Sequence, residues 1–85
     1  MVTFRTETQN YDTSGTIDGM GATDIEFFNQ GTSFVLINSR KILPNESWSI
    51  NGFPYEKNYT KYLAKFEAGV FVNLLVVTSR IYEKK

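Results

Sequence analysis

The residues with the clearest potential for metal chemistry are aspartates near a glycine-rich segment. Asp12, Asp18 and Asp24 lie in or beside the stretch NYDTSGTIDGMGAT (residues 10–23), which holds three of the six glycines. Oxygen-rich loops can bind a hard cation such as Ca²⁺. The spacing does not match an EF-hand, because Ile17 stands where that loop requires glycine and no glutamate closes it. We therefore expect no metal site and interpret these acids as turn-forming residues.

Catalytic chemistry has few candidate groups in this chain. The sequence contains neither histidine nor cysteine, which removes the commonest general base and every thiolate nucleophile, thiolate ligand and disulfide. A glycosidase-like carboxylate pair could be drawn from the nine acids, but nothing in the sequence predicts a cleft around one. We expect no catalytic residues, no cofactor and no enzymatic activity.

Binding has better candidates, in and after the segment NGFPYEKNY. Phe53, Tyr55 and Tyr59 stand there among polar neighbours, and Lys61 and Lys65 follow. Aromatic rings held on a rigid β-scaffold can stack on sugars or anchor a protein contact. The alternative is that Phe53 and one tyrosine cap the open end of the fold. We take these five residues as the candidate contacts.

The net charge is zero but unevenly distributed. Residues 1–30 carry one cation and five acids, whereas residues 31–85 carry eight cations and four acids. This division either reflects two ordinary solvated faces or favours the association of copies, acidic face to basic face. The neutral total argues against a nucleic-acid partner. The N-terminus does not resemble a secretion signal, and the longest apolar run is too short to span a bilayer, so we expect no membrane partner.

The elements that would position these groups are predicted to be strands. We expect one domain over residues 1–85, an all-β, small antiparallel β-sandwich of about seven strands, immunoglobulin-like or jelly-roll-like. Residues 1–24 are expected to form an N-terminal edge strand (Val2 to Gln9) followed by a flexible glycine-rich loop. Residues 25–83 are expected to form the sandwich core.

Two turns are predicted inside residues 27–52, which would make this segment two consecutive hairpins. Gly31 can adopt the positive φ of a tight turn between the strands DIEFFNQ and TSFVLINS. Pro44 and Asn45 are typical of the central positions of a type II turn. The strand SWSIN then alternates apolar and polar residues up to Asn51 and Gly52.

Residues 59–68 are ambiguous between a short amphipathic helix and a strand. The strand is favoured, because Tyr62, Ala64 and Phe66 alternate with Lys61, Leu63 and Lys65 and the neighbouring segments all resemble strands. The segment VFVNLLVVTSRIYEK is the strongest strand and is expected near the centre of a sheet, bent around Asn73. The predicted core comprises Phe34, Leu36, Trp48, Ile50, Phe66, Leu74 and Val76.

The segments IEFFNQGTSFVLINSRKILPNESWSING, KYLAKFE and NLLVVTSRIYEKK resemble small β-sandwich structural proteins of tailed bacteriophage virions, especially phages of Bacteroidetes hosts. The family pattern has a strand, Asn-x-Gly-Thr, a Val-x-Ile-Asn strand, a Leu-Pro-Gly-x-Ser turn, an aromatic-rich strand and a terminal strand ending near Ile-Tyr. The matching positions are Asn29, Gly31, Thr32, Val35, Ile37, Asn38, Leu43, Pro44, Ser47, Phe66, Ile81 and Tyr82, with Asn45 in place of the family's glycine.

The resemblance implies a non-enzymatic component of the virion, such as a capsid decoration, head-fibre or connector protein. It implies that the major capsid protein or other virion proteins are the partners, that many copies assemble, and that the protein is made in the host cytoplasm. The alternative from another class is a carbohydrate-binding or adhesion module that uses Tyr55, Tyr59 and Trp48. A nucleic-acid-binding barrel is a third possibility, disfavoured by the neutral charge.

Overall fold

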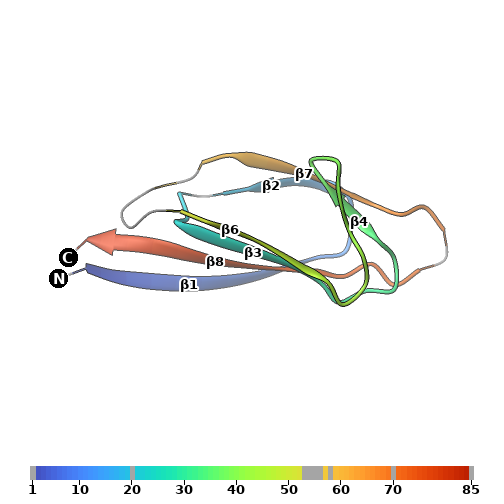
Figure 1. Ribbon diagram of the computed structural model, residues 1–85, viewed down its shortest axis with the longest axis horizontal. Helices are drawn as coiled ribbons and strands as arrows, with labels where there is room; N and C mark the ends of the chain where they lie inside the picture. The colour runs from blue at the N-terminus through green and yellow to red at the C-terminus, as the bar shows by residue number, and fades with distance from the viewer. Residues whose placement is uncertain (1, 20, 53–56, 58, 70, 85) are drawn as a thin grey trace.

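Eight strands form two four-stranded antiparallel sheets, stacked as two layers in an elongated body (Figure 1). The computed structural model describes residues 2–19, 21–52, 57, 59–69 and 71–84, and none of these residues is helical. The all-β sandwich prediction is confirmed, with eight strands rather than about seven. The strands are β1 (Val2–Tyr11), β2 (Gly15–Asp18), β3 (Asp24–Asn29), β4 (Val35–Ile37), β5 (Arg40–Ile42), β6 (Ser47–Asn51), β7 (Lys61–Phe66) and β8 (Leu75–Lys84).

The pairing of the strands is that of a long hairpin rolled up on itself. β1 pairs with β8, β2 with β7, β3 with β6 and β4 with β5, and successive pairs alternate between the layers. Sheet A has the order β1-β8-β3-β6, and sheet B has the order β2-β7-β4-β5. Eight strands in two sheets with this order form a jelly roll, so of the two architectures expected from the sequence, the immunoglobulin-like one does not apply.

The tip of the rolled hairpin is a two-residue turn between β4 and β5. Asn38 and Ser39 both have positive φ, 48° and 73°, as a type I′ turn requires. The sequence predicted that the strand would continue through these residues, and this is wrong. Asparagine tolerates the left-handed region because its short side chain can bond locally. In this turn the side chain bonds a neighbouring strand instead, because the Asn38 Oδ1 accepts a hydrogen bond from the Leu63 amide of β7 at 2.8 Å.

The prediction of two consecutive hairpins is also wrong, because β3 and β4 lie in different sheets and the chain crosses between the layers over residues 30–34. Gly31 is therefore not a hairpin residue with positive φ. It is needed for close approach, since a Cβ atom there would lie 2.2 Å from the Val72 carbonyl oxygen. The second turn is confirmed: Asn45 has φ 67° and the Glu46 amide donates to the Leu43 carbonyl at 3.0 Å. It carries the chain from β5 in sheet B to β6 in sheet A.

A strand replaces part of the long loop predicted over residues 10–23. β2 pairs with β7 from Gly15↔Ala64 to Asp18↔Lys61, and Ile17 is buried in the core. Ala22 is buried as well. These two apolar side chains hold a segment whose glycine and aspartate content is otherwise typical of a loop.

The core lies between the sheets, around Phe27. Its ring stacks on Trp48 with centroids 5.6 Å apart and meets Tyr62 edge-on at 5.2 Å. The strand prediction for residues 59–68 is confirmed, because Tyr62, Ala64 and Phe66 of β7 are all buried. The buried apolar residues are Ile17, Ala22, Ile25, Phe27, Val35, Ile37, Ile42, Tyr62, Ala64, Phe66, Leu75, Val77 and Ile81.

The predicted core is correct for Phe66, and Trp48 and Ile50 are partly buried against it. Elsewhere it is wrong by one position. Val35, Ile37, Leu75 and Val77 point inward, whereas Phe34, Leu36, Leu74 and Val76 are only half-buried. Both segments are apolar at successive positions, and a shift of one residue exchanges the two faces of a strand. The central place of β8 in sheet A is confirmed.

A buried asparagine holds the crossing between the sheets. Asn29 is fully buried; its Nδ2 donates to the carbonyls of Ser33 at 2.7 Å and Ile42 at 3.0 Å, and its Oδ1 accepts from the Gly31 amide at 3.0 Å. The Ser33 hydroxyl bonds the Asn73 Oδ1 at 2.6 Å. The Asn-x-Gly-Thr motif thus has a structural role, because it satisfies buried backbone groups where the chain changes layer.

Candidate functional site: the outer face of sheet B

Two of the predicted contacts lie together on the solvent side of β7. Lys61, Leu63 and Lys65 alternate with the buried residues of the strand and point away from the core. Leu63 is 60% exposed, which is unusual for a large aliphatic side chain in the middle of a strand. The arrangement follows from the two-residue period of the strand, which the sequence reveals directly.

Neighbouring strands extend this surface. Leu36 of β4 lies opposite Lys65 on one side and opposite Lys41 of β5 on the other, so two lysines flank one half-buried leucine across three strands. The Lys41 Nζ lies 4.3 Å from the centroid of the Phe34 ring, a cation–π contact. The basic face is defined here as Phe34, Leu36, Lys41, Lys61, Leu63 and Lys65.

Two of the described acids border the basic face. Glu67 directly follows β7, and its Oε1 accepts a hydrogen bond from the Phe34 amide at 3.3 Å. Asp18 of β2 is paired with Lys61 across the strands, and Thr16 is paired with Leu63. Lys41 and Lys65 instead lie on either side of Leu36, which is the residue opposite each of them in the strand pairing. The face thus presents cationic side chains around apolar ones, which is the distribution of a protein interface with an apolar centre and a polar rim.

The remaining predicted contacts are less closely grouped. Phe53 and Tyr55 lie outside the described residues. Tyr59 is 66% exposed and precedes β7, and its ring lies close to Gly21, where a Cβ atom would come within 3.0 Å of it. Trp48, the third aromatic of the carbohydrate alternative, is already in contact with Phe27 and lies under the Arg40 guanidinium at 4.8 Å.

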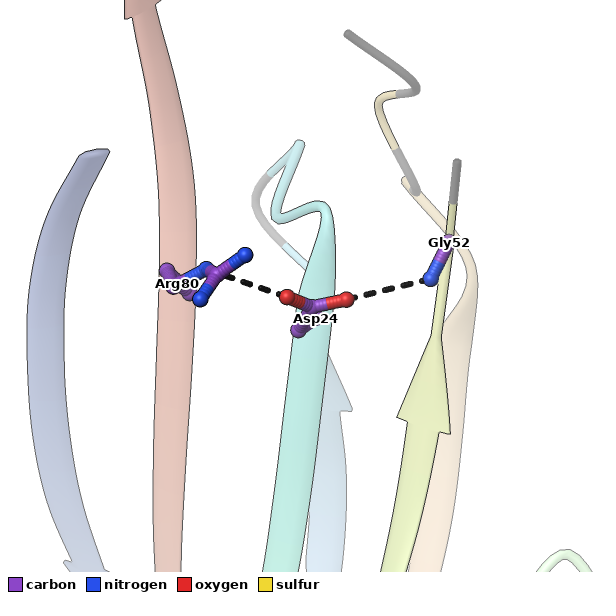
Figure 2. A network of polar contacts seen from close by, with 3 residues as sticks. All are labelled: Asp24, Gly52 and Arg80. Atoms are coloured by element: carbon purple, nitrogen blue, oxygen red, sulfur yellow. Dashed lines mark hydrogen bonds and ion pairs between the residues drawn. The ribbon is translucent and has the colours of Figure 1, made fainter. Parts of the chain in front are cut away.

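The aspartates of the glycine-rich segment do not assemble into a metal site. Within the described ranges, no group of three or more acidic residues is placed to hold a metal ion. Asp18 borders the basic face, and Asp24 lies at the start of β3 in sheet A. Asp24 Oδ2 forms an ion pair with the Arg80 Nε at 3.0 Å and Asp24 Oδ1 accepts from the Gly52 amide at 3.1 Å, linking three neighbouring segments (Figure 2).

This ion pair belongs to a shallow groove on the outer face of sheet A, which the sequence analysis missed. The groove has a volume of about 230 Å³. Its polar lining comes from four strands: Thr6, Asp24, Glu26, Ser49, Asn51, Thr78 and Arg80. Non-local pairing brings these residues together, so no local pattern could have indicated them. Arg80 also lies over the Phe4 ring at 4.2 Å.

Tyr11 titrates differently from an ordinary tyrosine. Burial raises the pKa of Tyr11 above its usual value of 10.0, and the nearby Asp18 carboxylate raises it further. The Tyr11 hydroxyl donates to the Gln9 Oε1 at 2.6 Å. Tyr11 and Asp18 line a cavity of about 10 Å³ between β1 and β2, which is too small for anything larger than one water molecule.

Comparison with protein-family models, with curated proteins and with solved structures finds no match to this chain. Along the described residues, no helix long and apolar enough to cross a membrane is present.

Proposed function

We propose that this chain is a non-enzymatic structural protein of a tailed-phage virion, a capsid decoration or head-fibre component. In this proposal it docks in many copies on an acidic protein surface of the particle through the basic face. The observation that carries the proposal is the exposed Leu63 between Lys61 and Lys65, next to the Lys41–Leu36–Lys65 row.

The fold supports a role in the virion by analogy. Jelly rolls occur in viral capsid proteins and in lectins, although a fold alone does not determine a function. The motifs that resemble virion proteins coincide with the features that hold the jelly roll together, namely the buried Asn29 and the turn at Asn45. The resemblance therefore supports the architecture more directly than the partner.

The chemistry of the basic face indicates how docking would work. Leu36 and Leu63 would supply the apolar centre of the contact, and the lysines would steer an acidic partner into register. Because exposed charges are screened within about 8 Å at physiological ionic strength, the contact should weaken as salt is added.

The test is co-sedimentation of the purified protein with intact phage particles, followed across a salt series. Lys65→Glu should abolish sedimentation with the particles, and the wild-type protein should be released by salt. Lys57→Glu is the matched control, because it makes the same charge change at an exposed site before β7. The proposal fails if the wild-type protein does not bind particles, or if both variants bind as well as wild type.

Carbohydrate binding is the second candidate, favoured by the exposed Tyr59 ring. A glycan array screened with wild-type protein and with Tyr59→Ala would test it. Binding of a glycan that disappears in Tyr59→Ala, combined with no binding to particles, would favour the adhesion module over the virion protein.

A further inference from the structure

The longest open backbone edge of the described fold belongs to β1. Four strands lie at sheet edges: β1, β6, β2 and β5, with ten, five, four and three residues. β1 pairs with β8 along its full length, from Val2↔Lys84 to Tyr11↔Leu75. No other described strand pairs with it, so its second edge offers a row of backbone donors and acceptors to a further strand.

The charges of β1 favour one particular partner strand. Arg5 and Glu7 point to the same side of β1, and the Arg5 Nε lies 3.2 Å from the Glu7 Oε1. Both side chains remain partly exposed, at 54% and 35%. A partner that places an acid opposite Arg5 and a base opposite Glu7 would extend this ion pair into an alternating square of four charges.

A second copy of β1 fulfils this condition in one register. If two β1 strands pair antiparallel with Thr6 opposite its own copy, Arg5 lies opposite Glu7 of the second copy, and Glu7 lies opposite the copy's Arg5. Side chains that lie opposite each other in an antiparallel strand pair point to the same side of the sheet. The outer faces of the two A sheets therefore lie on the same side of the joined sheet. Phe4 then lies opposite Thr8 of the second copy, and both contribute to that outer face.

The adjacent registers that keep the faces aligned are electrostatically unfavourable. Moving the centre of symmetry to Arg5 places the two arginines opposite each other, and moving it to Glu7 does the same with the two glutamates. Like charges directly opposite each other destabilise a strand pair. The charge pattern thus selects the register centred on Thr6 from its neighbours.

We propose that two copies of this protein associate through their β1 strands in that register. The product is a two-fold symmetric dimer in which the A sheets join into one continuous eight-stranded sheet. Such an isologous contact uses the same surface on both subunits. It does not involve the basic face, which remains open in each copy.

Charge reversal provides the first test, by analytical ultracentrifugation of the full chain from about 1 µM to about 1 mM. Wild-type protein should dimerise within this range. Residue 5 of each copy faces residue 7 of the other, so Arg5→Glu and Glu7→Arg each give two facing pairs of like charge. Each variant should therefore weaken dimerisation at least about ten-fold. A mixture of the two variants should form a heterodimer, because every facing pair is then of opposite charge. Lys65→Glu should dimerise like wild type.

A cysteine at the centre of symmetry provides the second test. The chain has no cysteine, so Thr6→Cys introduces a single thiol. Facing Cα atoms in an antiparallel pair are about 4.5–5.5 Å apart, within the range of a disulfide. Mild oxidation should cross-link Thr6→Cys to a dimer, while Thr8→Cys, which faces Phe4 of the second copy, should cross-link far less.

Circular dichroism establishes that each variant remains folded. The proposal is overturned if folded wild-type protein stays monomeric at the highest concentration, as it would if β1 receives a strand from a different protein. It is also overturned if both single reversals dimerise like wild type, if their mixture gains nothing, or if Thr8→Cys cross-links as readily as Thr6→Cys. These readouts do not depend on phage particles, so they stand or fall separately from the proposed docking function.

Discussion

Replacement of Gly31 by alanine should be among the most damaging single-methyl changes in this protein. A Cβ atom at Gly31 would lie 2.2 Å from the Val72 carbonyl oxygen and 2.7 Å from the Leu74 amide nitrogen. Ordinary van der Waals contact begins at 3.4 Å, so the two backbone segments would have to separate by about 1.2 Å. Neither neighbour can rotate away, because both belong to the backbone.

The separation would break the hydrogen bonds that join these segments. The Gly31 amide donates to the Leu74 carbonyl at 3.1 Å, and the Thr32 amide donates to the Val72 carbonyl at 2.8 Å. Losing two such bonds costs about 2 kcal/mol, and overpacking adds about 1 kcal/mol or more. We expect a loss of about 3 kcal/mol from a total stability of about 4–13 kcal/mol. The melting temperature should fall by about 12–24 °C.

Urea denaturation followed by the fluorescence of Trp48, the single tryptophan, measures this loss. Gly15→Ala is the matched control, because it adds the same methyl group in β2 with no atom within 4 Å of it. The control should be neutral or slightly stabilising, since alanine restricts the unfolded chain. If the free energies of unfolding of the two variants agree within about 0.5 kcal/mol, the close approach of residues 30–32 to residues 72–74 is refuted.

Three further predictions concern the buried asparagine, a turn and a tyrosine. Asn29→Ala should lower the free energy of unfolding by about 2–4 kcal/mol in urea, because the Ser33 and Ile42 carbonyls lose the Asn29 Nδ2 donor, while the Gly31 amide keeps its bond to the Leu74 carbonyl; a loss under about 0.5 kcal/mol would contradict this. Asn45→Gly should be neutral in thermal melts, whereas Asn45→Val should cost about 1 kcal/mol or more because of the positive φ; equal stability of the two would contradict the turn. The pKa of Tyr11 is raised in the folded state, so its contribution to stability is present below pH 10.0 and is lost as the pH rises through the folded pKa. In spectrophotometric titration, Tyr11→Phe should remove this late-titrating group, while Asp18→Asn should lower the Tyr11 pKa only part of the way, since burial is the larger cause.

Local chemistry made part of the fold predictable. The turn at Asn45 follows from the restrictions that Pro44 places on the backbone and from the tolerance of asparagine for positive φ. The strand β7 is favoured over a helix by the alternation of Lys61 and Lys65 with Tyr62 and its buried neighbours, although the apolar Leu63 lies on the lysine face. In both cases the decisive information lies within a few adjacent residues.

The orientation of the most apolar strands could not be predicted in the same way. Around Val35 and Leu75 the chain is apolar at successive positions, so periodicity does not distinguish the inner face from the outer one. Which face of these strands points inward depends on the strands that pair with them in the rolled fold, and those strands are distant in the sequence. β2 was missed for a related reason, because Ile17 is a single inward apolar residue among glycines and acids.

The candidate site was likewise predictable only in part. The common face of Lys61 and Lys65 follows from their spacing on one strand. The addition of Leu36 and Lys41 depends on the order of strands in sheet B, which a sequence pattern does not encode. The groove that contains Asp24 and Arg80 depends in the same way on sheet A.

The position of β8 at the centre of sheet A determines when this protein can fold. β8 joins β1 to β3, yet it is the last of the eight strands to be synthesised (Figure 1). Sheet B can pair completely as soon as β7 has emerged from the ribosome, while β1 and the β3–β6 pair are still unconnected. Their apolar sides remain open during that interval, and contacts between segments so distant in the chain form slowly. Nascent chains that stall before β8 should therefore be substrates for chaperones, and closure of sheet A should be the event that releases the protein in its native form.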